Sequence, residues 1–289
     1  MLALTPSQLL ARRYTHAVFA GGGNRCWWQA GLVEVLARQA CWEVVHLVGA
    51  SAGAGIAAAF ATGRLRDALE TAATRFDDTP ANVQWRELLR GRRPFPLPAI
   101  YRDWVASFVD AAGHARLAAA APRVEVAITR VTRWLPHALG AGLALGLYAT
   151  ERLWARSFHD PFPRRFGLRP QYLDLAQSRD AGEACRWLSA SAAAVPIAPG
   201  VRLDGRLALD GGFYDNVPLP LDAASHASTL VLLNEHQPGL PRAFELGGRA
   251  YLQPAWPVAA VKLDCTRGDA VRRTFEQGRH EALELLARG

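Results

Sequence analysis

The sequence predicts a single α/β domain with a largely parallel sheet. Residues 15–20 (THAVFA) are apolar and lead into three glycines, and a helix with apolar residues at helical spacing follows over 25–38. Residues 44–48 form a second apolar stretch, which ends at a turn of small residues before an alanine-rich helix that reaches residue 61. Two strand–turn–helix units in succession are typical of α/β proteins, in which helices join parallel strands.

The rest of the chain alternates helices, strands and loops less regularly. We expect helices over 65–75, 83–89, 100–112, 180–193 and 268–288, strands over 124–129, 207–209 and 229–233, a partly helical stretch over 133–156, and a proline-rich loop over 160–170. No internal repeat or linker divides the chain, so one domain is expected over 1–289. Its motif-bearing core would be 15–235, with helical insertions over 63–122 and 133–170 and a closing helix over 268–288.

Composition excludes several classes of protein. Half of the 289 residues are hydrophobic, which excludes extensive disorder. The 33 basic and 26 acidic side chains give a net charge of +7, yet no basic helix or aromatic–basic alternation indicates a nucleic-acid partner. The longest uncharged apolar stretch, 138–149, is too short to cross a bilayer, and the N-terminus has no secretory pattern. We therefore expect a cytoplasmic protein that binds no nucleic acid.

The metal-ligating residue types show no ligand pattern. Cys26, Cys41, Cys185 and Cys265 lack C-x-x-C spacing and the density of a disulfide framework, which suits a reduced compartment. No cluster of Asp, Glu and His has ligand spacing. We expect no metal and no cofactor.

The run Gly49-Ala50-Ser51-Ala52-Gly53 matches the pattern G-x-S-x-G. An apolar strand precedes it and a helix-forming run follows, which puts the serine on a sharp strand-to-helix turn with its hydroxyl clear of the sheet. That position suits a nucleophile. The alternative is a serine that only caps the helix.

A serine nucleophile needs a base and an oxyanion hole. Asp210 ends a predicted strand and precedes Gly211 and Gly212, so its carboxylate is a candidate base; a plain turn is the alternative. The histidines that follow Ser51 lie in no recognisable catalytic context.

The turn of Gly21, Gly22, Gly23, Asn24 and Arg25 follows a strand and opens a helix. Successive backbone amides in such a turn can point at one anion. A dinucleotide fingerprint would need a small residue at the next position, where cysteine stands, and a Walker lysine is absent. A transient oxyanion is therefore the expected anion.

In their order, these motifs resemble those of the patatin-like phospholipase family. Gly-Gly-Gly-x-Arg, G-x-S-x-G and Asp-Gly-Gly follow one another, and Ala190–Pro199 (ASAAAVPIAP) and Asp210–Pro218 (DGGFYDNVP) resemble the family's segments around its catalytic aspartate. The likeness is strongest over 15–62 and 185–235. It implies a three-layer α/β/α fold with a mainly parallel central sheet, and a serine enzyme that hydrolyses carboxylic esters of phospholipids or lysophospholipids.

Carried over residue by residue, the resemblance implies that Ser51 is the nucleophile and Asp210 its sole partner. The glycine turn, with the amide of Ala52, would supply the oxyanion hole, and Arg25 would brace the turn and could meet a headgroup phosphate. One position departs from the family, which has glycine where this chain has Cys26. A side chain there would tilt the turn or narrow the pocket.

Two other functions stay open at this point. The same dyad serves acyl transfer, in which an alcohol replaces water, and a lipid-binding module could carry an idle dyad. Peripheral membrane contact is also expected, because a lipase must bring its pocket to a lipid surface. Two stretches suit that role: 134–154, and the loop that carries Phe162, Arg164, Arg165, Phe166 and Arg169.

Overall fold

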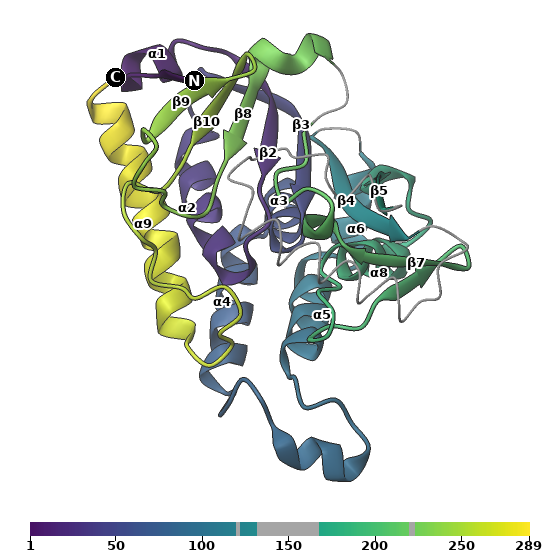
Figure 1. Ribbon diagram of the computed structural model, residues 1–289. Helices are drawn as coiled ribbons and strands as arrows, with labels where there is room; N and C mark the ends of the chain where they lie inside the picture. Colours follow the sequence, from purple (N-terminus) through teal and green to yellow (C-terminus); the bar gives the residue numbers. More distant parts are fainter. Residues whose placement is uncertain (120–121, 132–167, 220–222) are drawn as a thin grey trace.

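The computed structural model describes residues 1–119, 122–131, 168–219 and 223–289. They form a ten-stranded mixed sheet with the order β1-β9-β10-β8-β2-β3-β4-β7-β6, and β5 pairs with β4 outside this path (Figure 1). The strands are β1 (Leu2–Ala3), β2 (Tyr14–Phe19), β3 (Trp42–Ala50), β4 (Arg123–Val131), β5 (Leu168–Asp174), β6 (Val201–Leu203), β7 (Arg206–Asp210), β8 (Thr229–Leu232), β9 (Ala243–Leu246) and β10 (Arg249–Leu252).

The centre of the sheet is parallel, as the sequence predicts. β10, β8, β2, β3 and β4 pair in parallel, and antiparallel strands flank them at both ends. Both faces of a parallel sheet are normally covered, which agrees with the burial of residues 17–19 in β2 and 47–50 in β3.

One edge of β4 brings two strands end to end. β3 pairs with the first half of β4, where Ala50 lies opposite Ala127, and β7 pairs antiparallel with the second half, where Asp210 lies opposite Ile128. Because β5 pairs along 125–131, β3 and β7 must share the other edge of β4. The C-terminal ends of β3 and β7 therefore face each other at adjacent positions of β4, Ala127 and Ile128.

Helices lie on both sides of the sheet, which confirms the three-layer α/β/α architecture (Figure 1). The α-helices are α1 (Pro6–Leu10), α2 (Trp27–Leu36), α3 (Ala52–Ala61), α4 (Leu65–Asp77), α5 (Leu97–Phe108), α6 (Ala111–Ala118), α8 (Ala181–Ser191) and α9 (Gly268–Ala287). Short 3₁₀ helices are η1 (Gly23–Cys26), η2 (Trp85–Arg90), η4 (Leu175–Gln177), η5 (Gly211–Phe213) and η6 (Ala223–Ser228).

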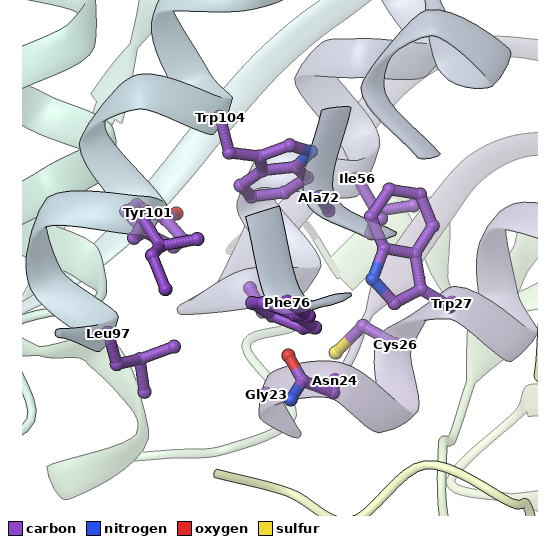
Figure 2. Close-up of a pocket in the computed structure, with 12 residues that line it drawn as sticks. Gly23, Asn24, Cys26, Trp27, Ile56, Ala72, Phe76, Leu97, Tyr101 and Trp104 are labelled. Carbon is purple, nitrogen blue, oxygen red and sulfur yellow. The ribbon is translucent and has the colours of Figure 1, made fainter. Parts of the chain in front are cut away.

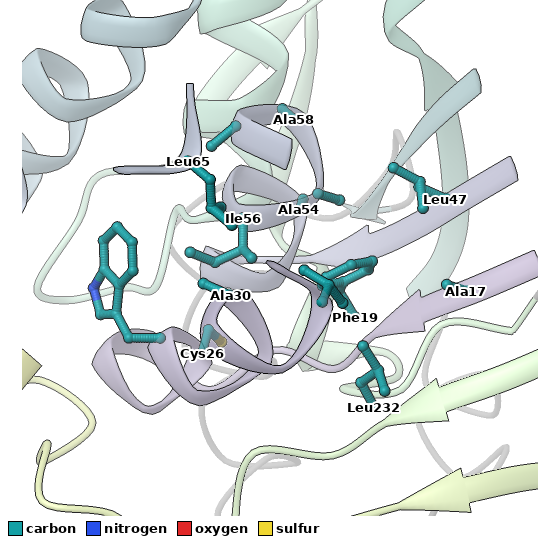
Figure 3. Packing of buried hydrophobic residues seen from close by; sticks show 14 of the residues in the cluster. Ala17, Phe19, Cys26, Ala30, Leu47, Ala54, Ile56, Ala58, Leu65 and Leu232 are labelled. Carbon is teal, nitrogen blue, oxygen red and sulfur yellow. The ribbon is translucent and has the colours of Figure 1, made fainter. Parts of the chain in front are cut away.

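The main core lies between the sheet and the larger helical layer. Phe19 and Leu47 of the sheet pack against Ala54 and Ile56 of α3, and all four are nearly or fully buried (Figure 3). α2 packs closely against α9 at Gly31 and Gly278. A Cβ at Gly31 would lie 1.9 Å from the carbonyl oxygen of Phe275 in α9, and one at Gly278 would lie 2.1 Å from that of Trp28 in α2. On the opposite face, Val217 and Leu219 pack against apolar side chains of the sheet such as Val18 and Val48.

Several predicted elements differ from the structure. The loop expected over 160–170 is wrong at its end, because Leu168–Asp174 is strand β5 with Pro170 opposite Thr129. The helix expected over 83–89 is the exposed 3₁₀ helix η2. The hairpin of β9 and β10 was not predicted, and neither was β6. The expected stretch over 133–156 lies outside the described residues. No helix within the described part of the chain has the length and apolar character to cross a membrane.

Candidate active site

Ser51 lies on a strained turn between β3 and α3. Its backbone has φ 53° and ψ −132°, a left-handed conformation that residues other than glycine rarely adopt. Gly49 and Gly53 make the turn possible, since a Cβ at Gly49 would lie 2.5 Å from the Cα of Ala54 and one at Gly53 would lie 2.5 Å from the carbonyl oxygen of Phe19. The turn directs the Ser51 side chain away from the helix that it precedes.

The Ser51 hydroxyl donates a hydrogen bond to Oδ2 of Asp210 at 2.7 Å. The side chain makes no capping hydrogen bond to α3, so the alternative of a serine that only caps the helix does not hold. The two residues come together because β3 and β7 end at adjacent positions of β4. No described histidine hydrogen-bonds to either side chain: His236, for example, contacts the carbonyl oxygen of Pro254.

Burial sets the electrostatics of Asp210. The residue is buried, and loss of solvent raises the pKa of its carboxyl above the ordinary value. Hydrogen bonds from the Ser51 hydroxyl and from the Gly212 amide to Oδ1, at 2.8 Å, act in the opposite direction, as does the charge of Lys262. A buried carboxylate with a raised pKa is a stronger base than one in water.

Two residues that the sequence reasoning did not single out hold this pair in place. The backbone amide of Ser51 donates to Oγ of Ser191 at 2.8 Å, and that hydroxyl donates to the carbonyl oxygen of Ala127 at 2.7 Å. Thr129 donates from its hydroxyl to the backbone carbonyl of Asp210 at 2.8 Å. Ser191 lies in the Ala-Ser segment that carries the family resemblance, so a signal for it was present.

The amides of the glycine turn are used unequally. Gly21 donates to the carbonyl of Asn216 at 2.8 Å, and the amides of Asn24 and Arg25 also donate to backbone carbonyls. The amide of Gly23 donates to no group in the described residues, and that of Gly22 faces only the sulfur of Cys26, where it acts to lower the pKa of the thiol. The turn lies against Ser51, because a Cβ at Gly21 would be 3.4 Å from the Cβ of Ser51.

Asn216 joins the glycine turn to the aspartate segment. Its side-chain amide donates to the carbonyl oxygen of Gly21 at 2.5 Å, while its backbone carbonyl accepts from the Gly21 amide. Asn216 also packs closely against Gly212, because a Cβ at Gly212 would lie only 2.8 Å from Oδ1 of Asn216. Asn216 thus couples the two loops on either side of Ser51.

The far side of the glycine turn is closely packed. Gly23 has φ +56°, and a Cβ there would lie 1.9 Å from the carbonyl oxygen of Lys262. Arg25 forms an ion pair with Glu235 at 2.7 Å and is mostly buried, and its amide closes the 3₁₀ turn onto Gly22. The side chain of Arg25 therefore faces a carboxylate.

Cys26 is buried beneath the turn rather than exposed in it. Its thiol donates to the carbonyl oxygen of Ala20 at 3.4 Å, and Gln29 and Asn234 donate to the same oxygen at 3.0 and 2.8 Å. Burial raises the pKa of the Cys26 thiol to about 12. The thiol therefore stays protonated at neutral pH and serves as a small apolar group with one donor.

An apolar pocket lies beside the site (Figure 2), and its empty space, including the part that is open to solvent, is about 370 Å³. Its lining includes Gly23 of the glycine turn, Ala52, which follows Ser51, and several aromatic rings. Its remaining lining residues are Asn24, Cys26, Trp27, Ile56, Ala72, Phe76, Leu97, Ile100, Tyr101 and Trp104. The Tyr101 hydroxyl lies 3.4 Å from the Ser51 carbonyl oxygen, which links the pocket wall to the turn at Ser51.

No metal centre is apparent in the described part of the chain. No group of three or more His, Cys, Asp or Glu side chains there lies close enough together to hold a metal ion. The arrangement is that of a hydroxyl, a buried carboxylate, the amides of the glycine turn and an apolar pocket.

Comparisons with known proteins gave a family match and structural similarities. The sequence model of the patatin-like phospholipase family matches residues 17–223, which includes Ser51, Asp210 and the glycine turn. Among solved structures, VipD from Legionella pneumophila is similar with a TM-score of 0.49 and 12% identity, over 95% of this chain and 67% of that chain. None of the proteins with curated descriptions matches the sequence. Because the family model covers well over half of its length, the chain belongs to the patatin-like phospholipase family.

Proposed function

We propose that the protein hydrolyses carboxylic esters of phospholipids or lysophospholipids through an acyl-Ser51 intermediate, with Asp210 as the only acid–base residue. Family membership implies lipid acyl hydrolysis. The observation that carries the proposal is the 2.7 Å hydrogen bond between the Ser51 hydroxyl and the buried carboxylate of Asp210. A carboxylate can serve as the base here because burial raises its basicity.

In the first half of the reaction, Oδ2 of Asp210 accepts the Ser51 proton as Oγ bonds to the ester carbonyl carbon. The carbonyl π electrons move onto the oxygen, which becomes an oxyanion. When that oxyanion collapses, the bond to the alcohol oxygen breaks, and the departing alcohol takes the proton from Asp210. The acyl group is then left on Ser51.

In the second half, water attacks the acyl carbon and gives a proton to Asp210. Collapse of the second oxyanion breaks the bond to Oγ, which regains the proton from Asp210, and the fatty acid leaves. Both steps use one carboxylate alternately as base and acid, so no histidine is needed.

The amides of Gly22 and Gly23 are the proposed oxyanion donors. They belong to a turn that lies against Ser51. The Gly23 amide donates to no described group and the Gly22 amide faces only the weakly accepting sulfur of Cys26, whereas the amides of Gly21, Asn24 and Arg25 donate to backbone carbonyls. Donors that are fixed before the reaction stabilise the developing charge without reorganisation. The apolar pocket beyond Ala52 suits the acyl chain, because hydrocarbon is favoured by an aromatic and aliphatic lining.

The test is a mutant cycle on defined phospholipids and on a short soluble ester. Ser51→Ala and Asp210→Asn should each lower kcat/KM by about 10⁴-fold or more, and the double variant should be little worse, because the residues act as a unit. A fluorophosphonate probe should label Ser51 in the parent. His236→Ala is the control and should retain activity.

Two outcomes would overturn the proposal. If His236→Ala, His226→Ala or His280→Ala lost as much activity as Asp210→Asn, a triad would replace the dyad. If the parent failed to react with the probe and hydrolysed no ester, the chain would be a binding module with an idle dyad. Product analysis with added alcohol separates hydrolysis from acyl transfer.

A further inference from the structure

The chain between α4 and α5 projects away from the rest of the fold (Figure 1). It contains η2, in which no residue is buried. Three large apolar side chains stand in solvent there: Trp85 is 68% exposed, Leu88 52% and Leu89 89%. We call residues 84–96 the projecting loop. Three exposed apolar side chains within five residues are costly in water and indicate a surface that binds a partner.

The same loop is strongly basic. It carries Arg86, Arg90, Arg92 and Arg93 against a single acid, Glu87, which gives a net charge of +3. Glu87 forms ion pairs with Arg90 at 2.6 Å and with Arg92 at 3.6 Å, and Arg86 has no ion-pair partner in the described residues. Apolar side chains beside arginines match the interfacial region of an anionic bilayer, where hydrocarbon and phosphate lie within one side-chain length.

The backbone holds the loop in this shape. At the base of the loop, the amide of Gln84 donates to the carbonyl oxygen of Pro94 at 2.7 Å. Near the tip of the loop, the amide of Arg92 donates to the backbone carbonyl oxygen of Glu87 at 2.9 Å. Arg93 reaches the carbonyl oxygen of Pro196 at 3.3 Å. A shaped loop loses less conformational entropy on binding than a flexible one.

The loop also continues directly into the walls of the pocket. Phe76, near the end of α4, and Leu97, the first residue of α5, both line the pocket (Figure 2). A bilayer that contacted the loop would therefore lie at the helix ends that border the pocket, so a lipid could pass into it without crossing bulk water.

We propose that the projecting loop docks the protein onto the surface of an anionic phospholipid bilayer, with Trp85, Leu88 and Leu89 entering the interface. The inference rests on the proposed function, which makes a bilayer lipid the substrate. Of the two stretches that the sequence suggested for this role, 134–154 lies outside the described residues, as does the second apart from Arg169.

The test measures vesicle binding and ester hydrolysis separately. Binding is followed by co-sedimentation with vesicles of phosphatidylcholine alone or with about 30 mol % phosphatidylglycerol, in a Ser51→Ala background so that the vesicles stay intact. Hydrolysis of a short soluble ester is measured with Ser51 present. The parent should bind the anionic vesicles more tightly, and salt should weaken that binding.

Two double variants address the two parts of the loop. Arg86→Glu/Arg92→Glu should weaken binding to anionic vesicles at least about 25-fold, which is about fivefold for each arginine. Leu88→Ser/Leu89→Ser should weaken binding at least about tenfold to both kinds of vesicle. Neither should change kcat/KM on the soluble ester.

Matched controls carry the same changes elsewhere. Arg38→Glu/Arg288→Glu and Leu2→Ser/Leu283→Ser alter exposed side chains outside the loop and should bind within about twofold of the parent. Trp85→Phe should bind vesicles as the parent does. It should lose most of the quenching of tryptophan fluorescence by brominated lipids, because Trp85 is the tryptophan that we expect to enter the bilayer.

The outcomes separate this proposal from the proposed function. Loop variants that bind like the parent, or controls that lose as much, would refute the docking surface while ester hydrolysis still stood. A parent that binds neither kind of vesicle would also refute it and would leave the loop to a partner of another kind. Loss of ester hydrolysis in Ser51→Ala bears only on the proposed function.

Discussion

Ser191→Ala tests whether the turn that carries the proposed nucleophile, Ser51, depends on a fully buried residue beneath it. The Ser191 hydroxyl accepts from the Ser51 amide at 2.8 Å and donates to the Ala127 carbonyl at 2.7 Å, and the side chain is fully buried. Its removal leaves one donor and one acceptor without a partner, each at a cost of about 1–3 kcal/mol. We expect the free energy of unfolding to fall by about 2–4 kcal/mol, because partial relaxation recovers some of that cost.

Catalysis should fall as well, since the Ser51 amide helps to hold φ at 53°. A loss of about 10–100-fold in kcat/KM on a soluble ester is expected, equivalent to about 1.4–2.7 kcal/mol. The assay pairs urea denaturation with steady-state kinetics well below the unfolding midpoint. Ser191→Thr keeps the hydroxyl and should restore most of the activity.

Ser178→Ala is the matched control for this experiment. The Ser178 hydroxyl is also buried and lies between two partners, the carbonyl of Leu175 at 2.6 Å and the ring of His114 at 3.0 Å, but it contacts neither catalytic side chain. The substitution Ser178→Ala should lower the free energy of unfolding without lowering kcat/KM. The reasoning fails if Ser191→Ala keeps parental kcat/KM, or if Ser178→Ala loses as much.

The other predictions concern charge and space at the site. Because burial raises the pKa of Asp210, kcat/KM should fall as pH drops through that raised pKa, which a pH–rate profile measures. Above the same pKa, the buried ionised carboxylate lowers the free energy of unfolding, so Asp210→Asn should raise that free energy at pH 8. The gain should shrink as the pH falls toward the pKa that Asp210 has in the unfolded chain. Urea melts at several pH values check this; a gain that grew on acidification would be the wrong sign. Gly23→Ala should unfold or inactivate the enzyme, because its Cβ would meet the Lys262 carbonyl at 1.9 Å, as circular dichroism and ester assays would reveal. Cys26→Gly should cost about 1–2 kcal/mol in urea melts while keeping ester hydrolysis, and the native Cys26 thiol should resist iodoacetamide at pH 8, because its pKa is about 12.

The parts of the fold with local signals were predictable. The parallel centre of the sheet follows from apolar runs that lead into glycine turns, and helix α9 (Gly268–Ala287) follows from its helical periodicity over 268–288. The missed β9–β10 hairpin also had a local signal in the sequence, the pair Gly247-Gly248 between its strands. A tight hairpin turn favours glycine at such positions, and both glycines have positive φ in the structure. The short strands on either side of the turn hid it.

Contacts between distant segments were not predictable in the same way. Ser191 and Asn216 reach partners 140 and 195 positions away in the chain, and no spacing rule connects residues at such separations. η2 was predicted as an ordinary helix, because its apolar residues have helical spacing. In the structure they have nothing to pack against, and nearby prolines limit its length.

Because β3 and β7 end at adjacent positions of β4, the rate of ester hydrolysis depends on the register in which β7 pairs with β4. The smallest slip of β7 along β4 that keeps each side chain on its own face is two residues, or about 6.6 Å. Such a slip would carry Asp210 far outside the 2.7 Å hydrogen bond to Ser51 while leaving the strand and helix content unchanged. During refolding, recovery of activity would therefore report the correct pairing of β7 with β4, an event that far-ultraviolet circular dichroism cannot distinguish from a shifted hairpin.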